Sequence, residues 1–283
     1  AFLLLYLLEK EKVITLETGI KTFFPHLEFD TTLIHLLTHT SGLPKWYPFY
    51  LYNGDYLSQL ASLKLKSRPG RRVIYSCVGY ILLYYIIEKM AGTSYKSIAE
   101  EVIFEPLSLK NTFLTVPEHL RVLTAPTEQG NLYEKKMALK THPEAARRFQ
   151  WRENIIQGET HDCNSWYLDG TAGNAGLFST VEDIFKLTRT FYPGFSSILS
   201  PQSTQYFWKN FTPLQREAFV RLFAEFLGRF YMGQLQEKYK DERLIYVSQE
   251  MIAAGRALVR VKVVWKAQEI PVDLLMIKRK GQW

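Results

Sequence analysis

The chain has 283 residues, of which 47% are hydrophobic and 22% are charged, with 16 glycines and 12 prolines. These values are typical of a protein that folds around a core, and they exclude disordered, collagen-like and disulfide-dense classes. The formal net charge of +7 indicates a mildly basic solvated surface, and we expect no nucleic-acid partner. No apolar run reaches the roughly 18 residues that a membrane-spanning helix needs.

Helical patterns dominate the first 200 residues. Residues 1–11 are apolar nearly all round and then charged, which predicts a buried helix. A second helix is predicted to begin at Asp30 or Thr31, either of which can cap its first turn. The apolar spacing over residues 78–90 predicts a third helix, with Gly92 in the left-handed conformation that ends it.

The next stretch has fewer signals. Residues 118–157 are polar and weakly periodic, so we expect a long excursion over the surface. The glycine-rich run 170–176 allows backbone to approach backbone or a ligand closely. Ser179 and Thr180, followed by two acidic residues, form a capping-box pattern that predicts a further helix.

The pattern changes after Pro201. A Thr-Pro start at residue 212 and an apolar face after it predict a helix that ends near Tyr239. Beyond it the period drops to two, and three strands of an antiparallel meander are predicted. These strands cover residues 244–247, 259–265 and 270–276.

Few isolated residues point to chemistry by themselves. His35 and His39 lie four positions apart, a spacing that can bring two imidazoles to one metal, but a zincin would need Glu where Leu36 stands. Local hydrogen bonding is the favoured interpretation, and we expect no metal and no cofactor. Cys77 and Cys163 lack the close partners of a zinc site, and a disulfide between them stays open.

Several ordered motifs together resemble the serine β-lactamase and penicillin-binding-protein family, in the branch that holds class C enzymes and related esterases. The resemblance covers residues 1–200. The motifs are Leu-Leu-Thr-His-Thr-Ser-Gly-Leu-Pro at 36–44, Tyr-Ser-Cys-Val-Gly-Tyr at 75–80, Pro106-Leu107, Asn111-Thr112, His161-Asp162 and Gly-Asn-Ala-Gly-Leu-Phe-Ser-Thr at 173–180.

This resemblance implies acyl-serine hydrolysis of an amide or ester, in a mixed fold of helices and an antiparallel sheet. In that family a Ser three residues before a Lys attacks a carbonyl, and a Tyr in a second motif helps to move the proton. Tyr75 matches that Tyr and is the expected proton carrier. Cys77, Gly173 and Gly176 are the expected substrate-binding positions.

Three departures from the family pattern bear on activity. No Ser-x-x-Lys occurs anywhere in the sequence, and by the resemblance we expect it just upstream of Ala1. Cys77 stands where the family has Asn, which exchanges an amide for a weakly bonding thiol. No Lys-Thr-Gly strand follows Ser200. We therefore expect this fragment to be inactive.

The tail resembles the C-terminal half of MlaC-type proteins, which are periplasmic phospholipid carriers. The resemblance rests on residues 211–219, the helix that ends near Tyr239, residues 258–264, and residues 269–273 with those that follow them to Trp283. It implies phospholipid as a ligand and leaves peripheral membrane association open, while an unrelated α+β module remains the alternative.

We therefore predict an α+β chain of two partial modules. Residues 1–202 form the β-lactamase-like part, helical with an incomplete antiparallel sheet, and residues 203–283 form a helix followed by a β-meander. The expected partner is a small amide, ester or peptidoglycan-like substrate, with phospholipid binding through the tail as the alternative function. Both resemblances imply a periplasmic or secreted location.

Overall fold

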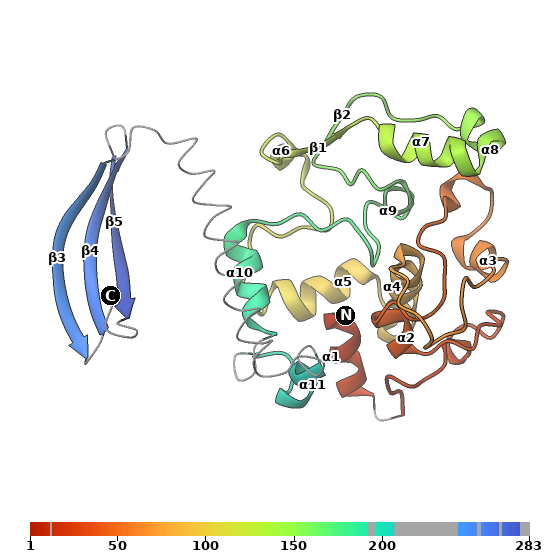
Figure 1. Ribbon diagram of the computed structural model, residues 1–283, viewed down its shortest axis with the longest axis horizontal. Helices are drawn as coiled ribbons and strands as arrows, with labels where there is room; N and C mark the ends of the chain where they lie inside the picture. The colour runs from red at the N-terminus through yellow and green to blue at the C-terminus, as the bar shows by residue number, and fades with distance from the viewer. Residues whose placement is uncertain (12, 192–195, 207–242, 254–255, 266–267, 278–283) are drawn as a thin grey trace. The chain divides into compact units, whose positions relative to one another are not determined.

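The computed structural model describes residues 1–11, 13–191, 196–206, 243–253, 256–265 and 268–277. The chain divides into two compact units, Ala1–Trp208 and Lys209–Trp283, and each is described by itself. The mixed helix-and-strand class predicted from the sequence is confirmed (Figure 1).

The first unit is built mainly from short helices. Its α-helices are α1 (Phe2–Lys10), α2 (Leu33–Leu37), α3 (Tyr56–Ala61), α4 (Cys77–Ala91), α5 (Tyr95–Ala99), α6 (Glu118–Arg121), α7 (Leu132–Thr141), α8 (Pro143–Arg148), α9 (Cys163–Tyr167), α10 (Val181–Arg189) and α11 (Pro201–Tyr206). Single turns of other helix types lie at η1 (Ile20–Thr22), η2 (Phe49–Leu51) and η3 (Glu100–Phe104). Strands β1 (Pro126–Gln129) and β2 (Ile155–Gln157) pair antiparallel.

The main core of this unit forms around α4, which α1 and α2 contact. The predicted helix at the start of the chain is confirmed as α1, and Leu4 on it is fully buried. Leu36 of α2 and Leu82 of α4 are also fully buried in the same cluster. Removal of this apolar surface from water is what holds the three helices together.

Predicted helix ends agree with the structure at Gly92 and Thr180, and Ser94 caps a third helix between them. Gly92 ends α4 in the left-handed conformation, with φ of 66°. Ser94 caps α5 by accepting a hydrogen bond from the backbone N–H of Ser97. Thr180 caps α10, as the capping-box pattern predicts, by accepting from the N–H of Asp183.

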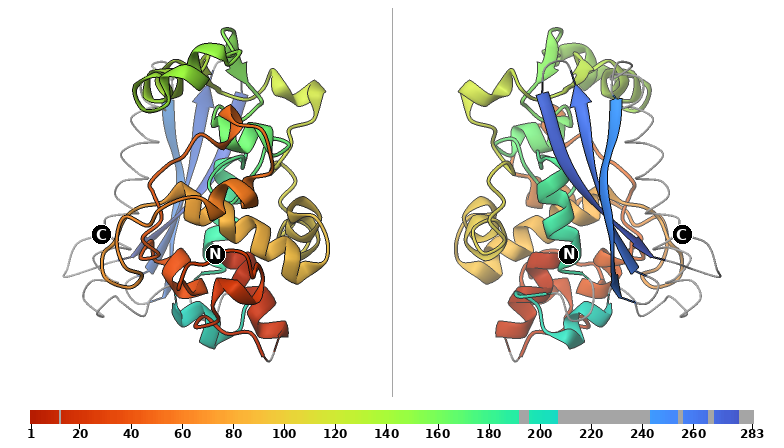
Figure 2. Two further views of the ribbon diagram at one scale, coloured as in Figure 1. Left: turned by 90° about the vertical axis from the view of Figure 1, so that its right-hand side faces the viewer. Right: turned by 90° about the vertical axis from the view of Figure 1, so that its left-hand side faces the viewer.

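The predicted surface excursion over residues 118–157 is wrong in part. This segment holds α6, the β1–β2 pair, α7 and α8, and it lies at the end of the first unit opposite to α1 and α11 (Figure 2). A second, smaller core forms beneath it around Tyr50, Ala138, Ala146, Trp151 and Cys163. The hydrophobic periodicity of residues 118–157 is weak because several of the buried side chains in this region are polar or aromatic, so they do not stand out from the exposed ones.

The second unit contains the predicted meander. Strands β3 (Arg243–Ala253), β4 (Arg256–Trp265) and β5 (Gln268–Ile277) form one antiparallel sheet in the order β3-β4-β5. The helix predicted from residue 212 to Tyr239 lies outside the described residues. Among the helices that the structure describes, none is both long and apolar enough to span a membrane.

Candidate active site

The residues predicted to carry chemistry gather at the start of α4. Ser76 caps this 15-residue helix, because its Oγ accepts from the N–H of Gly79 at 3.0 Å. The same hydroxyl donates to the carbonyl oxygen of Pro44 at 2.6 Å. Tyr75 and Cys77 flank the cap, so both side chains lie at the positive end of the helix dipole.

His39, from the motif at residues 36–44, packs its ring against Tyr75. Its ring stacks on Tyr80 with centroids 4.9 Å apart, and it lies 4.6 Å from the ring of Tyr75. Its Nδ1 accepts the backbone N–H of Ser76 at 3.1 Å, so the neutral ring carries its proton on Nε2. Burial lowers the pKa of His39, which favours this neutral form.

His35 and His39 do not share one helix, and each accepts a hydrogen bond from a backbone N–H, which agrees with the hydrogen-bonding role favoured from the sequence. Helix α2 ends at Leu37, and His39 lies beyond it with φ of 55°. Nδ1 of His35 accepts from the N–H of Thr32 at 3.3 Å and is thus part of the helix cap. No group of three or more metal-binding side chains occurs among the residues that the structure describes.

Tyr75 and Cys77 are brought together by the structure. Tyr75 is 62% exposed, and its pKa is raised, first by the neighbouring Cys77 and then by burial. The Cys77 thiol is half-buried, and its side chain interacts with those of Tyr75 and Asn174. Burial, followed by the charge of Asp162, raises the pKa of Cys77, so the thiol stays protonated at neutral pH.

Gly173 and Gly176 shape the loop beside this pair. A β-carbon at Gly173 would collide with the carbonyl oxygen of Tyr80 on α4, so the loop backbone packs directly against the helix. Gly176 has φ of 113°, and a β-carbon there would collide with Gly170 and Thr171. Both glycines thus act through the backbone, and they fix the loop that carries residue 174.

Asn174 is the residue that the sequence did not single out. Its Oδ1 accepts from the hydroxyl of Ser165 on α9 at 3.3 Å, and its side chain reaches the thiol of Cys77. Its position between Gly173 and Gly176 could have indicated it. The first of these glycines packs against α4, so the side chain that follows it lies close to that helix. The side-chain amide of Asn174 therefore lies beside Cys77, which has a thiol where the family motif has an amide.

Two acidic residues lie behind the site. Glu134 is buried on α7 and accepts from Nε1 of Trp46 at 3.3 Å and from the N–H of Cys163 at 3.0 Å. Burial, and then the charge of Asp162, raises the pKa of Glu134. Asp162 itself caps α9 by accepting from the N–H of Ser165 at 2.8 Å.

The His161-Asp162 pair takes part in local hydrogen bonds. The carbonyl oxygen of His161 accepts from Nδ2 of Asn131 at 2.8 Å and from the guanidinium of Arg152 at 2.9 Å. The disulfide left open by the sequence is not formed, since Cys77 and Cys163 are both free thiols.

Comparison with known proteins shows the family of the chain. The family model described as Beta-lactamase matches residues 1–232. The chain belongs to the beta-lactamase family. Over 169 residues it is 33% identical to an N-acetylmuramyl-L-alanine amidase of Bacillus subtilis (strain 168), which covers 54% of this chain and 36% of that protein.

Other relatives show the same partial coverage. A putative D-alanyl-D-alanine carboxypeptidase of Salmonella agona (strain SL483) is 30% identical over 173 residues, or 57% of this chain and 39% of that protein. The chain thus spans less than two fifths of the length of these curated relatives. The crystal structure of a beta-lactamase/D-alanine carboxypeptidase from Pseudomonas syringae shares the fold, with a TM-score of 0.51 and 17% identity over 71% of this chain and 50% of that chain.

A second family model, described as MlaC protein, matches residues 204–283. The resemblance of the tail to that family is therefore supported by a match over this stretch. The two matched ranges overlap over residues 204–232.

Proposed function

We propose that this chain carries the proton-transfer and substrate-binding side of an acyl-serine site for amide or ester bonds in peptidoglycan-like substrates. The observation that supports it is the meeting of the Tyr75 phenol, the Cys77 thiol and the Asn174 amide at the start of α4. The relatives named as an amidase and as carboxypeptidases favour an amide of a wall peptide. Such a substrate favours a location in the periplasm or outside the cell.

The role of Tyr75 follows from its protonation. Because the pKa of Tyr75 is raised, its phenol stays protonated at neutral pH and can donate a proton to a leaving group. It is a poor acceptor for the proton of an attacking hydroxyl, and such a hydroxyl is a weak nucleophile until a base takes its proton. The sequence has no Ser-x-x-Lys to supply either nucleophile or base. We therefore expect these 283 residues to bind substrate without turning it over.

Covalent labelling tests the absence of turnover. A fluorescent penicillin and a serine-directed fluorophosphonate are expected to leave the purified chain unlabelled. Calorimetry with a diacetylated Lys-D-Ala-D-Ala peptide is expected to show reversible binding that Asn174→Ala weakens. Stoichiometric labelling of a serine would contradict the inactivity, and a peptide that does not bind at all would contradict the substrate class.

A second function is supported by the tail. We take residues 1–202 as the hydrolase-like part and residues 203–283 as a phospholipid-binding part, and the MlaC match over residues 204–283 supports the second of these. Strand β3, at one edge of its sheet, has consecutive exposed apolar side chains: Ile245, Tyr246 and Val247, and again Met251 and Ile252. Because successive side chains of a strand point to opposite faces, these residues expose apolar groups on both faces of the sheet, and an exposed apolar face can receive acyl chains.

Mass spectrometry of an organic extract tests this second function. Phospholipid is expected to co-purify with the chain and to be lost in the double variant Met251→Ser, Ile252→Ser. Leu132→Ser, which changes an exposed apolar residue of the first unit, is the matched control and is expected to keep the lipid. Lipid at background level in the unaltered protein would argue against a carrier role.

A further inference from the structure

Helix α7 lies near the edge of the first unit and turns one face to solvent (Figure 1). Side chains that share a face of a helix recur every three or four residues. Glu134 and Ala138, four positions apart, are buried and mark the inward face of α7. The opposite face comprises residues 132, 133, 136, 139 and 140, all of which are exposed. We call these five residues the outer face of α7.

The outer face of α7 carries two leucines and a tyrosine. Leu132 is 66% exposed, Tyr133 70% and Leu139 38%. A surface helix of a globular protein ordinarily turns its apolar residues to the core and its charged residues to water. In α7 the carboxylate of Glu134 is buried while these three side chains are exposed, so that distribution is inverted. Apolar side chains gathered on one exposed face indicate contact with another apolar surface.

The other two residues of the outer face are lysines. Lys136 and Lys140 lie one helical turn apart, and neither forms an ion pair among the residues that the structure describes. The carboxylate of Glu128, close to the start of the helix, accepts from the backbone N–H of Tyr133 at 3.0 Å. The outer face itself has two positive charges and no acidic residue. It therefore complements a surface that is both apolar and negatively charged.

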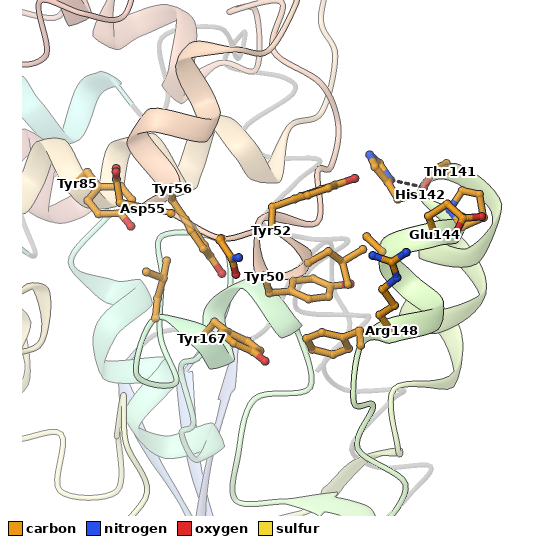
Figure 3. A pocket seen from close by; sticks show the side chains of 17 residues that line it. Tyr50, Tyr52, Asp55, Tyr56, Tyr85, Thr141, His142, Glu144, Arg148 and Tyr167 are labelled. Atoms are coloured by element: carbon orange, nitrogen blue, oxygen red, sulfur yellow. Dashed lines mark hydrogen bonds between the residues drawn. The ribbon is translucent and has the colours of Figure 1, made fainter.

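The helix that follows borders a different feature. Glu144 and Arg148 of α8 line a pocket of about 1100 Å³ together with Tyr52 and His142 (Figure 3). Glu144 is also paired with Arg147 at 3.0 Å. A concave pocket with aromatic walls suits a small molecule, whereas the convex outer face of α7 suits an extended surface.

We propose that the outer face of α7 docks the chain on an anionic lipid bilayer. Leu132 and Leu139 enter the boundary between head groups and acyl chains, and the ring of Tyr133 lies at the level of the head groups. The ammonium groups of Lys136 and Lys140 bind lipid phosphates. A helix of ten residues is about 15 Å long, so it lies in the plane of the interface and does not span the bilayer.

The charge of the outer face argues against a second copy of the chain as its occupant. Two copies related by a two-fold axis would bring Lys136 and Lys140 of one toward the same lysines of the other. The formal net charge of +7 adds to this repulsion. Negatively charged head groups attract the same lysines, and the acyl chains beneath them accept the apolar side chains.

Co-sedimentation of the full chain with lipid vesicles tests this surface. The chain is expected to bind vesicles of equal parts phosphatidylglycerol and phosphatidylcholine about 25-fold more tightly than vesicles of phosphatidylcholine alone, because each lysine contributes about fivefold. The double variant Lys136→Gln, Lys140→Gln loses most of this preference. Leu132→Ser weakens binding to the anionic vesicles about fivefold, because a side chain that enters the interface becomes polar.

Variants elsewhere in the chain serve as controls. Val13→Ser and Lys110→Gln change an exposed apolar and an exposed basic residue outside α7, and they leave the affinity for vesicles unchanged. The tail variant Met251→Ser, Ile252→Ser also keeps its binding to vesicles. It therefore distinguishes docking through α7 from phospholipid carriage by the second unit.

Several results would overturn the docking surface. One is an absence of binding to either kind of vesicle, and another is equal binding to both kinds. Vesicle binding that the α7 variants leave unchanged, or that the tail variant alone abolishes, would show that another part of the chain contacts the lipid. A dimer in sedimentation velocity that Leu132→Ser dissociates would assign the outer face to a second copy instead.

Discussion

The backbone N–H of Ser76 donates to Nδ1 of His39 at 3.1 Å and joins two motifs that lie 37 residues apart in the sequence. Because the ring of His39 also lies against Tyr75, one neutral imidazole holds the segment that presents the phenol. Protonation of Nδ1 would break this hydrogen bond, since the nitrogen would become a donor that faces another donor. The position of Tyr75 is therefore sensitive to pH.

The first prediction concerns this pH dependence. Burial lowers the pKa of His39 in the folded state, so the unfolded state binds its proton more tightly. The stability that the neutral ring contributes is present above the ordinary histidine pKa of about 6.5 and is lost as the pH falls through the lowered value. Urea unfolding between pH 8 and pH 5 is expected to show this loss, and His39→Asn is expected to reduce it.

The control for this prediction is His119→Asn, which changes an exposed histidine on α6. It is expected to leave the pH profile as in the unaltered chain. Equal slopes for the His39 variant and the unaltered protein would show that the buried imidazole does not contribute to the pH dependence.

The second prediction concerns the approach of the Gly173 loop to α4. Gly173→Ala places a methyl group against the Tyr80 carbonyl, and we expect a loss of about 2 to 3 kcal/mol in the free energy of unfolding. Gly92→Ala is the matched comparison, because Gly92 has φ of 66° but nothing within 4 Å of a β-carbon. It should lose about 1 kcal/mol from backbone strain alone.

Chemical denaturation followed by tryptophan fluorescence measures both changes. A Gly173 variant as stable as the Gly92 variant would mean that the loop moves away from the helix at little cost. In that case the loop would not be a rigid support for Asn174.

The sequence predicted the parts of the fold that depend on local patterns. The long apolar helix α4, its Gly92 end and the alternating strands of the second unit follow from periodicity and cap residues. Helix α7 did not, because its inward face carries Glu134 as well as Ala138. In a sequence pattern a buried carboxylate cannot be told from a surface one unless its hydrogen-bond donor is known. The donor here, Trp46, lies 88 residues away in the sequence.

In the candidate site, too, some features follow from local sequence patterns and others only from tertiary packing. The family motifs pointed to Tyr75 and Cys77, whose side chains interact in the structure, and the glycine run predicted a close backbone approach. Which backbone it approaches is set by tertiary packing, since Gly173 meets Tyr80 across more than 90 residues of chain. The contact between Asn174 and the thiol follows only from that packing.

The third prediction concerns the buried Glu134. Glu134→Ala leaves Nε1 of Trp46 and the N–H of Cys163 without their acceptor, and each unsatisfied donor costs about 1 to 3 kcal/mol. Glu134→Gln keeps a carbonyl acceptor and removes the charge, so it should be much less destabilising at neutral pH. Urea unfolding at pH 7 distinguishes the two variants.

The pH dependence of the same residue has a defined sign. Because the pKa of Glu134 is raised in the folded state, the folded chain holds the proton more tightly than the unfolded chain. The resulting stability is fully present below the ordinary glutamate pKa of about 4.3 and is lost as the pH rises through the raised value. The unaltered chain should therefore lose stability relative to Glu134→Gln from pH 4 to pH 7, whereas the exposed control Glu153→Gln should give a parallel curve.

The last prediction concerns residue 77, where a thiol stands in place of the amide of the family motif. Cys77→Asn restores a group that both donates and accepts, at the helix end where Tyr75 and Asn174 converge. One neutral hydrogen bond contributes about 0.5 to 1.5 kcal/mol, so the Lys-D-Ala-D-Ala peptide should bind about two- to tenfold more tightly by calorimetry. Cys77→Ala removes the thiol without adding an amide and should not tighten binding. If both variants bind the peptide as the unaltered chain does, residue 77 does not contact the substrate, and the site must lie elsewhere along α4.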